Sequence, residues 1–495
     1  MRLPEPDAAI LSRRAKIVAD LSTIVAADGV IADADGLSVY ETDGLSSYRQ
    51  LPLLAVLPRS TEEVAAVLAY CHAGRIKVVP RGAGTGVSGG ALPLADGVLL
   101  GLGKLNRILE VDFPNRCVVA QPGVTNQAIT QAVERENFYY APDPSSQFAC
   151  SIGGNVAENS GGIHCLKYGV TTNNLLGLEV VLMDGRVVRL GGRAMDASGY
   201  DFLGLLTGSE GLLGVITEVT VRILPRPETA QVLLLGFASH ATAGDCVGAI
   251  VAAGIIPAAL ELMDKAAVAA TEAFVRSGYP REAEAVILVE LDGTTVEVDD
   301  LVLRVRKIAE DFGAIVAGVA ETEEERVRVW AGRKSTFGAV GRLAPDCYAL
   351  DGTIPRGKLA EVFLKTGELA KARGLRIVNV FHAGDGNHHP LILFDANVPG
   401  DLEKAEALGA EILKLTVEVG GALSGEHGIG VEKRDLMRTA FSEMDLEHQQ
   451  RVKCVFDPHS LLNPGKVFPT LHRCAEMGRL RVREGKMPFP DLPRF

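Results

Sequence analysis

Three glycine-rich segments limit what this chain can fold into more than any other feature of the sequence. They read "PRGAGTGVSGG" (80–90), "SIGGNVAENSGG" (151–162) and "TGSEGLLG" (207–214). Glycine has no side chain, so successive backbone N–H groups can form a concave nest that binds an anion such as a pyrophosphate. The first segment alone could be a turn without a ligand. Three such segments together predict a long, phosphate-bearing cofactor.

The first segment contains the pattern G-x-G-x-x-G at residues 84–89, which is typical of dinucleotide-binding Rossmann folds. That fold requires a strand before the pattern and a helix opening on it. The run "RIKVVP" (75–80) predicts the strand, but Gly90, Pro93 and Gly97 follow, with no apolar residues at helical spacing. The sequence therefore predicts a phosphate cradle outside a Rossmann fold.

Length and charge restrict the class of protein further. A chain of 495 residues with 47% hydrophobic residues predicts two or three domains. A net charge of -12 without a basic stripe argues against nucleic-acid binding and against unaided docking on anionic lipid. The N-terminal residues do not resemble a secretory signal, and no run approaches ~18 apolar residues, so we expect a cytoplasmic protein. The eight cysteines include no Cys-x-x-Cys pair, so neither a disulfide framework nor an iron–sulfur ligand set is expected.

The pattern along the chain predicts four parts: a helical lead-in (1–49), a first domain (50–228), a second domain (229–468) and a C-terminal tail (469–495). In the first domain, Ser60 and Glu63 predict a capping box for a helix. Asp184-Gly185 predicts a type I′ turn in a β-hairpin. In the second domain, alternating strand-like and helical runs predict an α+β fold with helices on one face of an antiparallel sheet.

A second group of chemically active side chains lies in the second predicted domain. "NVFHAGDGNHHP" (379–390) and "ALSGEHGIG" (422–430) bring together several histidines and a glutamate in a chain with only 10 histidines. Two imidazoles and a carboxylate suit a Zn²⁺-like or Mn²⁺-like ion with positions open for substrate. The alternative is a set of surface or hydrogen-bonded loop histidines.

Arg333 and Lys334 follow the single tryptophan, Trp330, in a run with helical character. An arginine can bind a carboxylate bidentately, which makes Arg333 a candidate substrate anchor. From spacing alone, a solvated helix face is the simpler interpretation, and the acidic run at 321–325 is also interpreted as solvated.

Taken together, these motifs resemble a known family. The glycine-rich segments resemble the flavin domain of the vanillyl-alcohol-oxidase/PCMH superfamily, and "HAGDGNHHP" with "GEHGIGVEK" resembles its D-2-hydroxyacid dehydrogenase branch. Within that branch the chain is most similar to FAD-linked subunits of bacterial glycolate oxidases (glycolate dehydrogenases). The resemblance implies an α+β protein with a PCMH-type FAD-binding domain of two α+β subdomains and a C-terminal ferredoxin-like α+β cap domain.

The resemblance also implies site residues. The metal ligands would be His382, His389 and Glu426, for Zn²⁺ or Mn²⁺. His427 would be the catalytic base and Arg333 would bind the substrate carboxylate, which reverses the simpler interpretation of Arg333. His388 falls where the family motif varies and is not assigned as a ligand. Residues implied in FAD binding are Pro80, Arg81, Gly82, Ala83, Gly84, Thr85, Gly86, Ser88, Gly89, Pro142, Asp143, Ser151, Gly153, Gly154, Asn155, Asn159, Gly161, Gly162, Glu210, Gly211, Gly214, Ile216 and Asn463.

Two departures from relatives narrow the expected chemistry. Some relatives tether FAD through a histidine in the first glycine-rich segment. Thr85 stands at that place here, so we expect non-covalent FAD. Some use a lysine two residues before the motif that here reads Asp351-Gly-Thr-Ile-Pro355, where this chain has Ala349. We therefore expect a small monocarboxylic 2-hydroxyacid such as glycolate or D-lactate, with hydride passing from its α-carbon to the flavin.

Other functions remain as alternatives. One is a stand-alone D-lactate dehydrogenase, and another, less favoured, is a D-2-hydroxyglutarate dehydrogenase. A flavin-binding scaffold without activity would have no need of the histidine and glutamate set. The resemblance further implies a second flavin-type subunit and an iron–sulfur subunit that carry electrons towards a quinone rather than NAD. A cytoplasmic chain that contacts the inner membrane only through these partners is expected.

Overall fold

The computed structural model describes residues 3–194, 199–320 and 322–469. The predicted C-terminal tail thus lies outside the described residues except for residue 469. Within the described ranges, the chain forms three main sheets and a two-stranded one. Two of the main sheets belong to the N-terminal half, up to residue 228, and the third belongs to the C-terminal half.

The first sheet contains the strand that leads into the first glycine-rich segment. Its strands in spatial order are β1 (Val30–Ile31), β2 (Leu54–Val56), β4 (Gly97–Gly101) and β3 (Lys77–Arg81). Both β2 and β3 run parallel to β4. Helix α4 (Thr61–Gly74) starts where predicted, because the Ser60 side chain accepts a hydrogen bond from the Glu63 amide. The Glu63 carboxylate accepts from the Arg59 amide and not from Ser60, so only half of the predicted capping box forms.

The predicted helical lead-in packs into this first sheet. It contains α1 (Ala8–Ser12), α2 (Arg14–Leu21) and α3 (Ala34–Ser38), and its strand β1 pairs antiparallel with β2. Ile17 and Leu21 belong to the same buried apolar cluster as Val64 of α4 and Val78 of β3. The lead-in therefore shares a core with the segment that follows it.

The second sheet supports the other two glycine-rich segments. Its antiparallel strands in spatial order are β5 (Ile108–Asp112), β6 (Cys117–Ala120), β10 (Val215–Arg222), β8 (Leu175–Val181) and β9 (Val187–Gly191). The accompanying elements are α5 (Asn126–Val133), η1 (Glu134–Glu136), β7 (Phe138–Tyr139), α6 (Ile152–Glu158), α7 (Cys165–Tyr168), η2 (Thr171–Asn174), α8 (Phe202–Leu206) and β11 (Leu224–Pro225). β7 and β11 form the two-stranded sheet.

The predicted hairpin is present between β8 and β9, but its turn differs from the prediction. A type I′ turn requires positive φ at both central residues. Among the described residues, Gly185 (φ 87) has positive φ and Asp184 does not. The Gly185 amide donates to the Leu182 carbonyl at 2.9 Å, so the chain turns through 182–185 and only its last residue enters the left-handed region. The type I′ assignment was wrong because Asp184 keeps an ordinary backbone conformation.

The third sheet is built by the C-terminal half. Its spatial order is β15 (Val316–Ala320), β12 (Thr229–Phe237), β14 (Ala285–Gly293), β13 (Ala259–Asp264), β18 (Arg376–His382), β19 (Asn387–Phe394) and β16 (Asp346–Ala349), with β17 (Gly352–Thr353) also pairing with β19. Neighbouring strands of this sheet pair antiparallel. The helices of this half are α9 (His240–Ala252), α10 (Lys265–Phe274), α11 (Thr295–Asp311), α12 (Glu323–Val340), η3 (Arg356–Lys358), α13 (Leu359–Ala372), α14 (Asp401–Glu418), η4 (Arg434–Leu436), α15 (Met437–Ala440) and α16 (Glu443–Phe456).

Helices cover both faces of the third sheet, which corrects the expectation of one covered face. Leu233, Leu235 and Ile287 pack on the side of α9, α11 and α13. Their strand neighbours Val232 and Val286 pack on the opposite side, with α10 and α12. Successive strand residues point to opposite faces, so nearly continuous apolar runs such as "AVILVEL" are the mark of a sheet buried on both sides.

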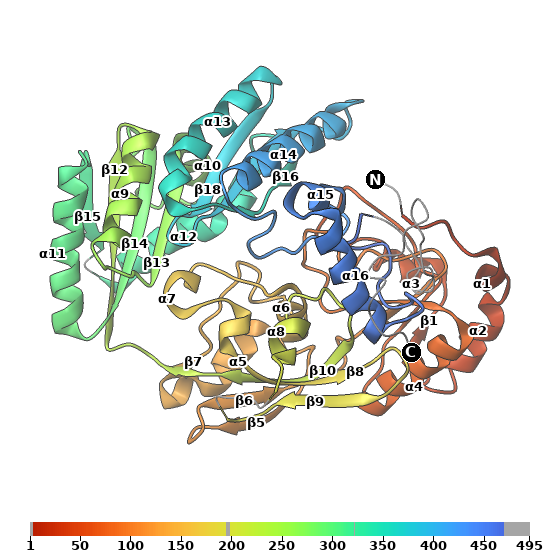
Figure 1. Cartoon of the computed structure of the whole chain (residues 1–495). Coiled ribbons are helices and arrows are strands. Elements are labelled where there is room, and N and C mark those ends of the chain that lie inside the picture. The colour runs from red at the N-terminus through yellow and green to blue at the C-terminus, as the bar shows by residue number, and fades with distance from the viewer. Residues whose placement is uncertain (1–2, 195–198, 321, 470–495) are drawn as a thin grey trace, which may run out of the picture.

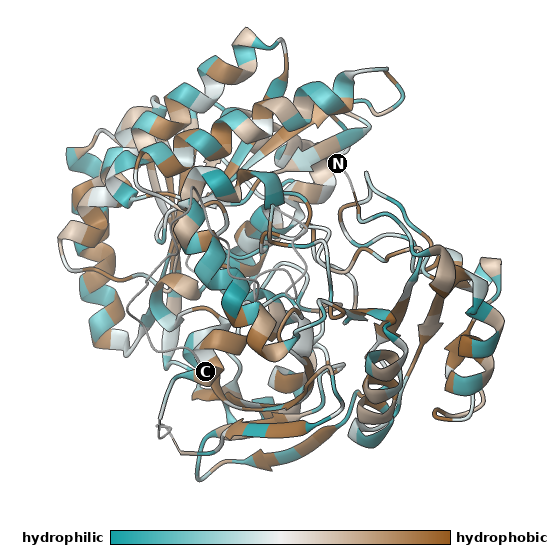
Figure 2. Cartoon of the chain, turned by 45° about the vertical axis from the view of Figure 1, so that its right-hand side comes forward, coloured by the Kyte–Doolittle hydropathy of each residue, from teal (hydrophilic) through white to brown (hydrophobic). Residues whose placement is uncertain are grey.

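The end of the described chain returns to the N-terminal half. Leu462 forms a parallel bridge with Val78 of β3. The Lys453 ammonium of α16 donates to the Leu212 carbonyl at 2.6 Å. Figure 1 shows the elements of the third sheet gathered on one side of the molecule and β5–β10 on another, and Figure 2 shows apolar residues concentrated in the strands. The C-terminal half is therefore attached to the N-terminal half at both of its ends.

None of the helices in the described ranges combines the length and the apolar character needed to cross a membrane.

Candidate active site

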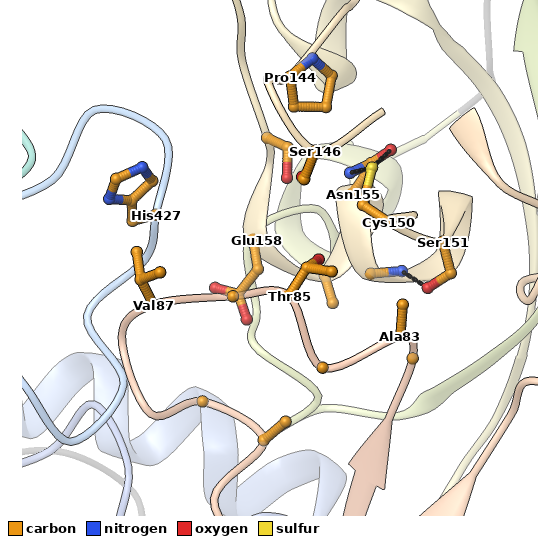
Figure 3. A pocket seen from close by; sticks show the side chains of 18 of the residues that line it. Ala83, Thr85, Val87, Pro144, Ser146, Cys150, Ser151, Asn155, Glu158 and His427 are labelled. Atoms are coloured by element: carbon orange, nitrogen blue, oxygen red, sulfur yellow. Dashed lines mark hydrogen bonds between the residues drawn. The ribbon is translucent and has the colours of Figure 1, made fainter. Parts of the chain in front are cut away.

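One cavity of about 490 Å³ is lined by both halves of the chain. Predicted cofactor residues on its wall are Pro80, Arg81, Gly82, Ala83, Gly84, Thr85, Gly86, Ser151, Gly153, Gly154, Asn155, Glu210, Gly211, Gly214 and Ile216. The other predicted residues on the wall are Arg333, His382, His389, Glu426 and His427. The structure thus brings the glycine-rich segments and the histidine–glutamate set to one cavity, part of which Figure 3 shows.

The first glycine-rich segment forms an open loop between two parallel strands. It follows β3 and leads to β4 without a helix, as the sequence predicted. Within the described part of the chain, no backbone amide of residues 82–90 donates a hydrogen bond to another residue. A row of free N–H groups on a cavity wall suits an anion, and these residues therefore fit the pyrophosphate of a dinucleotide cofactor.

The second glycine-rich segment opens helix α6 against the wall of the cavity. The Ser151 hydroxyl caps the helix by accepting from the Gly154 amide at 3.3 Å. Gly153 lies so close to Pro122 that an added Cβ would stand 2.4 Å from the Pro122 Cβ. Both residues line the cavity. Because their backbones approach each other directly, only a residue without a side chain fits at position 153.

Several predicted cofactor residues stand behind the cavity wall instead of on it: Ser88, Gly89, Pro142, Asp143, Asn159, Gly161, Gly162 and Asn463. The Ser88 carbonyl accepts hydrogen bonds from the Val431 and Glu432 amides, both at 3.0 Å. The Asn463 side chain donates to the carbonyl oxygens of Gly90 (3.0 Å) and Glu210 (2.7 Å). These contacts fix the loops that carry the lining residues.

The sequence interpretation did not include Glu158, which also lines the cavity. Figure 3 places its carboxyl group between Thr85 and His427. Its Oε2 atom is buried and has no hydrogen-bond partner among the described residues. Burial and the neighbouring Glu210 carboxylate raise the pKa of Glu158 well above its ordinary value. Its place inside the motif "NVAENSGG" was the only signal that could have indicated this role.

The histidine–glutamate set converges on a single carboxylate oxygen. Glu426 Oε1 lies 3.5 Å from His382 Nε2, 3.2 Å from His389 Nε2 and 3.8 Å from His427 Nε2. His382 ends β18, His389 lies in β19 and Glu426 lies in the loop that follows α14, so two paired strands and one distant turn assemble the group. Burial would raise the pKa of Glu426, but His382 and His389 outweigh it and hold that pKa well below its ordinary value.

The Nδ1 atoms of His382 and His389 also have hydrogen-bond partners. His382 Nδ1 lies 2.7 Å from Glu261 Oε1, and His389 Nδ1 lies 2.9 Å from the Leu350 carbonyl oxygen. Histidines that bind a metal through one nitrogen commonly have the other fixed by a carboxylate or a carbonyl. Glu261 was missed in the sequence, where its only signal is an acid inside the apolar strand run "AALELM".

His388 lies on the other side of the strand from His389. Its Nε2 is 3.0 Å from the Thr416 hydroxyl, away from the cavity wall. Burial lowers the pKa of His388 to about 3, so its imidazole is neutral. The alternation of side chains along β19 explains why adjacent histidines have different surroundings.

Arg333 is buried in α12, with 5% of its surface exposed, and is not part of a solvated helix face. Its Nε and Nη2 atoms contact Glu261 Oε2 at 2.8 and 2.7 Å. This contact uses one edge of the guanidinium group. Arg333 also lines the cavity, and its second edge, which includes Nη1, forms no hydrogen bond with a described residue.

A buried carboxylate fixes the turn that carries Glu426 and His427. Asp351 accepts hydrogen bonds from the amides of Gly425, Glu426 and His427, at 2.9–3.3 Å. Its charge is balanced by Lys433 Nζ at 2.9 Å, and both side chains are fully buried. Burial opposes ionisation, but Lys433 outweighs it and holds the pKa of Asp351 well below its ordinary value. Burial also lowers the pKa of His427 to about 4.

The residues present fit a metal ion. His382, His389 and Glu426 each offer a ligand atom, and these atoms lie within 4.8 Å of one another. The corresponding atoms of Asp351, His389 and His427 also lie within 4.8 Å of one another. However, Asp351 already accepts from three amides and from Lys433, which leaves it poorly suited as a ligand. The first set, in which both Nδ1 atoms have hydrogen-bond partners, matches the donors that Zn²⁺ and Mn²⁺ accept.

Comparison with known proteins identifies the class to which this fold and cavity belong. The FAD binding domain family matches residues 52–191, and the family of FAD linked oxidases, C-terminal domain, matches residues 226–467. Together they define a FAD-linked oxidoreductase. The cavity therefore belongs to a flavoenzyme, which confirms FAD as the cofactor.

Sequence relatives narrow this class. The chain is 56% identical over 456 residues to the glycolate oxidase subunit GlcD of Escherichia coli (strain K12), covering 92% of this chain and 91% of that protein. It is 38% identical to GlcD of Bacillus subtilis (88% and 92% covered) and 36% identical to a D-lactate dehydrogenase of Archaeoglobus fulgidus (91% and 99% covered). The chain belongs to the family of FAD-linked oxidases that contains GlcD, which confirms the resemblance noted in the sequence.

Solved structures agree on the fold. p-Cresol methylhydroxylase with bound substrate aligns with a TM-score of 0.79 at 18% identity, covering 93% of this chain and 97% of that one. A 4-ethylphenol oxidase from Gulosibacter chungangensis aligns with a TM-score of 0.77 at 19% identity, covering 94% and 99%. The expected fold class, a PCMH-type FAD-binding domain followed by a C-terminal cap, is confirmed.

Proposed function

We propose that this chain oxidises glycolate, and also D-lactate, to the corresponding 2-oxoacid with FAD as hydride acceptor. The observation that carries the proposal is the shared cavity. Its wall holds residues 82–87 of the open amide loop together with Arg333, His427 and the histidine–glutamate set. The names of the GlcD and D-lactate dehydrogenase relatives support the choice of substrate class.

Arg333 is the proposed anchor for the substrate carboxylate. Its Nε–Nη2 edge is bound to Glu261, so the edge that contains Nη1 is the one left for substrate. A guanidinium group offers its N–H donors in a fixed plane, which orients a bound carboxylate as well as holding it. A substrate held at this point keeps a fixed distance and angle to the other groups of the cavity.

His427 is the proposed base that accepts the hydroxyl proton. Its Nδ1 is buried and has no hydrogen-bond partner in the described part of the chain, and its ring lines the cavity. The turn that carries it is held by Asp351, so the imidazole has a defined position relative to the cavity. A base fixed within hydrogen-bond reach of the substrate is what general base catalysis requires.

FAD and a divalent metal ion would complete the site. The 82–90 loop and the start of α6 would hold FAD, which supplies the hydride acceptor when bound. Thr85 offers no side-chain nitrogen to the flavin, so we propose that FAD is held without a covalent bond. His382, His389 and Glu426 would hold Zn²⁺ or Mn²⁺, which supplies a Lewis acid that lowers the pKa of a bound hydroxyl group.

The size and charge of the substrate are proposed from a single position in the sequence. Ala349 stands where some relatives of this branch have a lysine, which leaves less anchorage for a second carboxylate. This favours glycolate and D-lactate over D-2-hydroxyglutarate. A stand-alone D-lactate dehydrogenase is the main alternative.

We further propose that electrons leave FAD through partner subunits, a flavin-type chain and an iron–sulfur chain, towards a quinone. Two observations support this: the relative GlcD is named as a subunit, and the sequence has no Cys-x-x-Cys pair that could begin an iron–sulfur ligand set. Any contact with the inner membrane would then be made through these partners.

Anaerobic mixing tests the proposed substrate class. The purified yellow protein is mixed with glycolate, D-lactate, L-lactate or D-2-hydroxyglutarate, and bleaching of the flavin absorbance is followed. We expect rapid bleaching by glycolate and D-lactate only, abolished by removal of the metal with a chelator and absent in His427→Ala with its FAD content intact. Equal bleaching by L-lactate, or unchanged bleaching in His427→Ala, would contradict the assignment.

A further inference from the structure

A single buried carboxylate joins the proposed substrate anchor to one of the proposed metal ligands. Glu261 lies in β13 and is completely buried. It stands opposite His382 in the pairing of β13 with β18, so the sheet register itself places the two side chains side by side. Arg333 reaches the same carboxylate from α12.

The two carboxylate oxygens of Glu261 contact different residues. Oε2 receives Nε and Nη2 of Arg333 at 2.8 and 2.7 Å, whereas Oε1 lies 2.7 Å from His382 Nδ1. Arginine has only donors and keeps its charge in proteins, so Oε2 acts as an acceptor. The salt bridge favours the ionised carboxylate, which then accepts from an N–H on His382 Nδ1.

This arrangement determines which nitrogen of His382 carries the proton. In the neutral imidazole that a metal requires, Nδ1–H directed at Glu261 leaves the lone pair on Nε2, on the side that faces Glu426. The tautomer of a metal-binding histidine is set by the hydrogen bond of its other nitrogen. The same carboxylate also turns the guanidinium plane of Arg333, so that its second edge is the one left for substrate.

We propose that Glu261 is a positioning residue that couples metal binding at His382 to carboxylate binding at Arg333. The coupling rests on the proposed function, because it assumes that these two residues hold the metal and the substrate. It goes beyond that function by making the two binding events depend on one side chain that contacts neither ligand. An ion pair with a purely structural role would affect stability and leave both affinities of the folded protein unchanged.

The substitution Glu261→Gln tests the coupling. A glutamine has nearly the same shape, but it has one acceptor oxygen and one donor amide where two acceptors are needed. Either the Arg333 contact or the His382 Nδ1–H contact is therefore lost, and the amide then faces another donor. We expect Zn²⁺ affinity to fall at least tenfold, in line with the effect of removing a partner of a ligating histidine, and KM for glycolate to rise at least tenfold.

The measurement uses the full chain with FAD bound. Zn²⁺ affinity is determined by competition with a chromophoric chelator, and the FAD content is checked by absorbance. Asp264→Asn is the matched control. Asp264 lies in the same strand and is buried, but within the described ranges its carboxylate accepts hydrogen bonds from Ala267 and Asn379 and from none of the site residues. The control should keep the wild-type Zn²⁺ affinity and KM.

The outcomes separate the coupling from the proposed function. If the wild type binds no Zn²⁺ or Mn²⁺, the metal part of the proposed function fails. If the wild type binds metal and Glu261→Gln binds it equally tightly with unchanged KM, the coupling is overturned. Should Glu261→Gln fail to fold, Glu261→Asp decides, because it keeps the charge and shortens the reach. We expect weaker Zn²⁺ binding and a higher KM in this variant too, and wild-type values would overturn the coupling.

Discussion

Asp351 shows at the scale of a single residue how the turn around Glu426 and His427 is held. Its carboxylate accepts from three successive amides of that turn and forms a fully buried ion pair with Lys433. Replacing it with asparagine would remove the charge and leave the Lys433 ammonium buried without its counter-ion. Removal of one partner of a buried ion pair is strongly destabilising.

We therefore expect Asp351→Asn to lower the free energy of unfolding by about 3–5 kcal/mol and to slow the reduction of bound FAD by glycolate. Chemical denaturation followed by tryptophan and flavin fluorescence measures the first effect. Asp184→Asn is a control, because the hydrogen bonds that Asp184 forms with described residues join it to its neighbour Arg186 at an exposed turn. A variant at position 351 as stable as this control would contradict the role given to Asp351.

Gly153 provides a second prediction at the scale of one residue. A Cβ at this position would stand 2.4 Å from the Pro122 Cβ and 3.1 Å from its carbonyl oxygen, both parts of a rigid proline. We expect Gly153→Ala to move α6 away from Pro122 and to lower the FAD content of the purified protein. Gly103→Ala should keep the wild-type content, because a Cβ there meets nothing within 4 Å. The ratio of flavin to protein absorbance checks both variants, and equal ratios would show that the close approach is unimportant.

At the scale of elements, His164 forms one of the contacts between the two halves. This residue precedes α7, and its ring lies between Asp143 (2.9 Å) and Glu290 of β14 (3.3 Å). Burial opposes protonation of His164, but the two carboxylates outweigh it and raise its pKa well above the ordinary value. The pKa values of Asp143 and Glu290 are lowered, since contact with His164 outweighs their burial.

The direction of these shifts predicts how stability depends on pH. The raised pKa of His164 gives a contribution that is complete below its unfolded value, about 6.5, and is lost as the pH rises through the higher folded value. The two lowered carboxyl pKa values give a contribution that is lost as the pH falls below about 4. The stability advantage of the wild type over His164→Gln should thus be largest between these limits and shrink in alkaline solution. Denaturant unfolding at several pH values tests this, and a constant advantage would exclude a charged His164.

Helices and strands were predicted from the sequence more accurately than turn conformations and the packing of the sheets. The helix after Ser60 and the strand before the first glycine-rich segment are local patterns, and both are present. The predicted type I′ turn was wrong because dipeptide preference does not determine the φ of Asp184. The second covered face of the third sheet was missed although the continuous apolar run "AVILVEL" indicated it, because the alternation of helices and strands was interpreted without that signal.

The residues that line the candidate site could be predicted from the sequence. The residues that hold them in position could not. Histidines are rare in this chain and the glycines of the site are clustered, so their motifs are easily seen in the sequence. Glu261 and Asp351 look ordinary there, since their importance comes from partners far along the chain, namely Arg333, His382 and Lys433. From spacing alone Arg333 looked like part of a solvated helix face, and only the family resemblance reversed that interpretation before the structure showed its buried partner Glu261.

At the scale of the whole molecule, the proposed route of electrons leads to a further prediction. The free cysteines identified among the described residues are mostly buried singly, and the sequence has no Cys-x-x-Cys pair. We expect the purified chain to be reduced quickly by glycolate under anaerobic conditions and to pass electrons to a quinone or oxygen only slowly. Steady-state turnover with each acceptor, compared with the rate of flavin bleaching, measures this. Full-rate turnover by the chain alone would contradict the need for partner subunits.

The return of residues 453–463 to the first sheet and to Leu212 also has a consequence for how the protein is made. The N-terminal half leaves the ribosome first, and domains commonly fold in that order during synthesis. Here the part of its core that contains Leu462 is translated only after the whole third sheet. The core of the N-terminal half is therefore completed only after the third sheet has been synthesised, and the apolar surface that Leu462 covers is exposed until then.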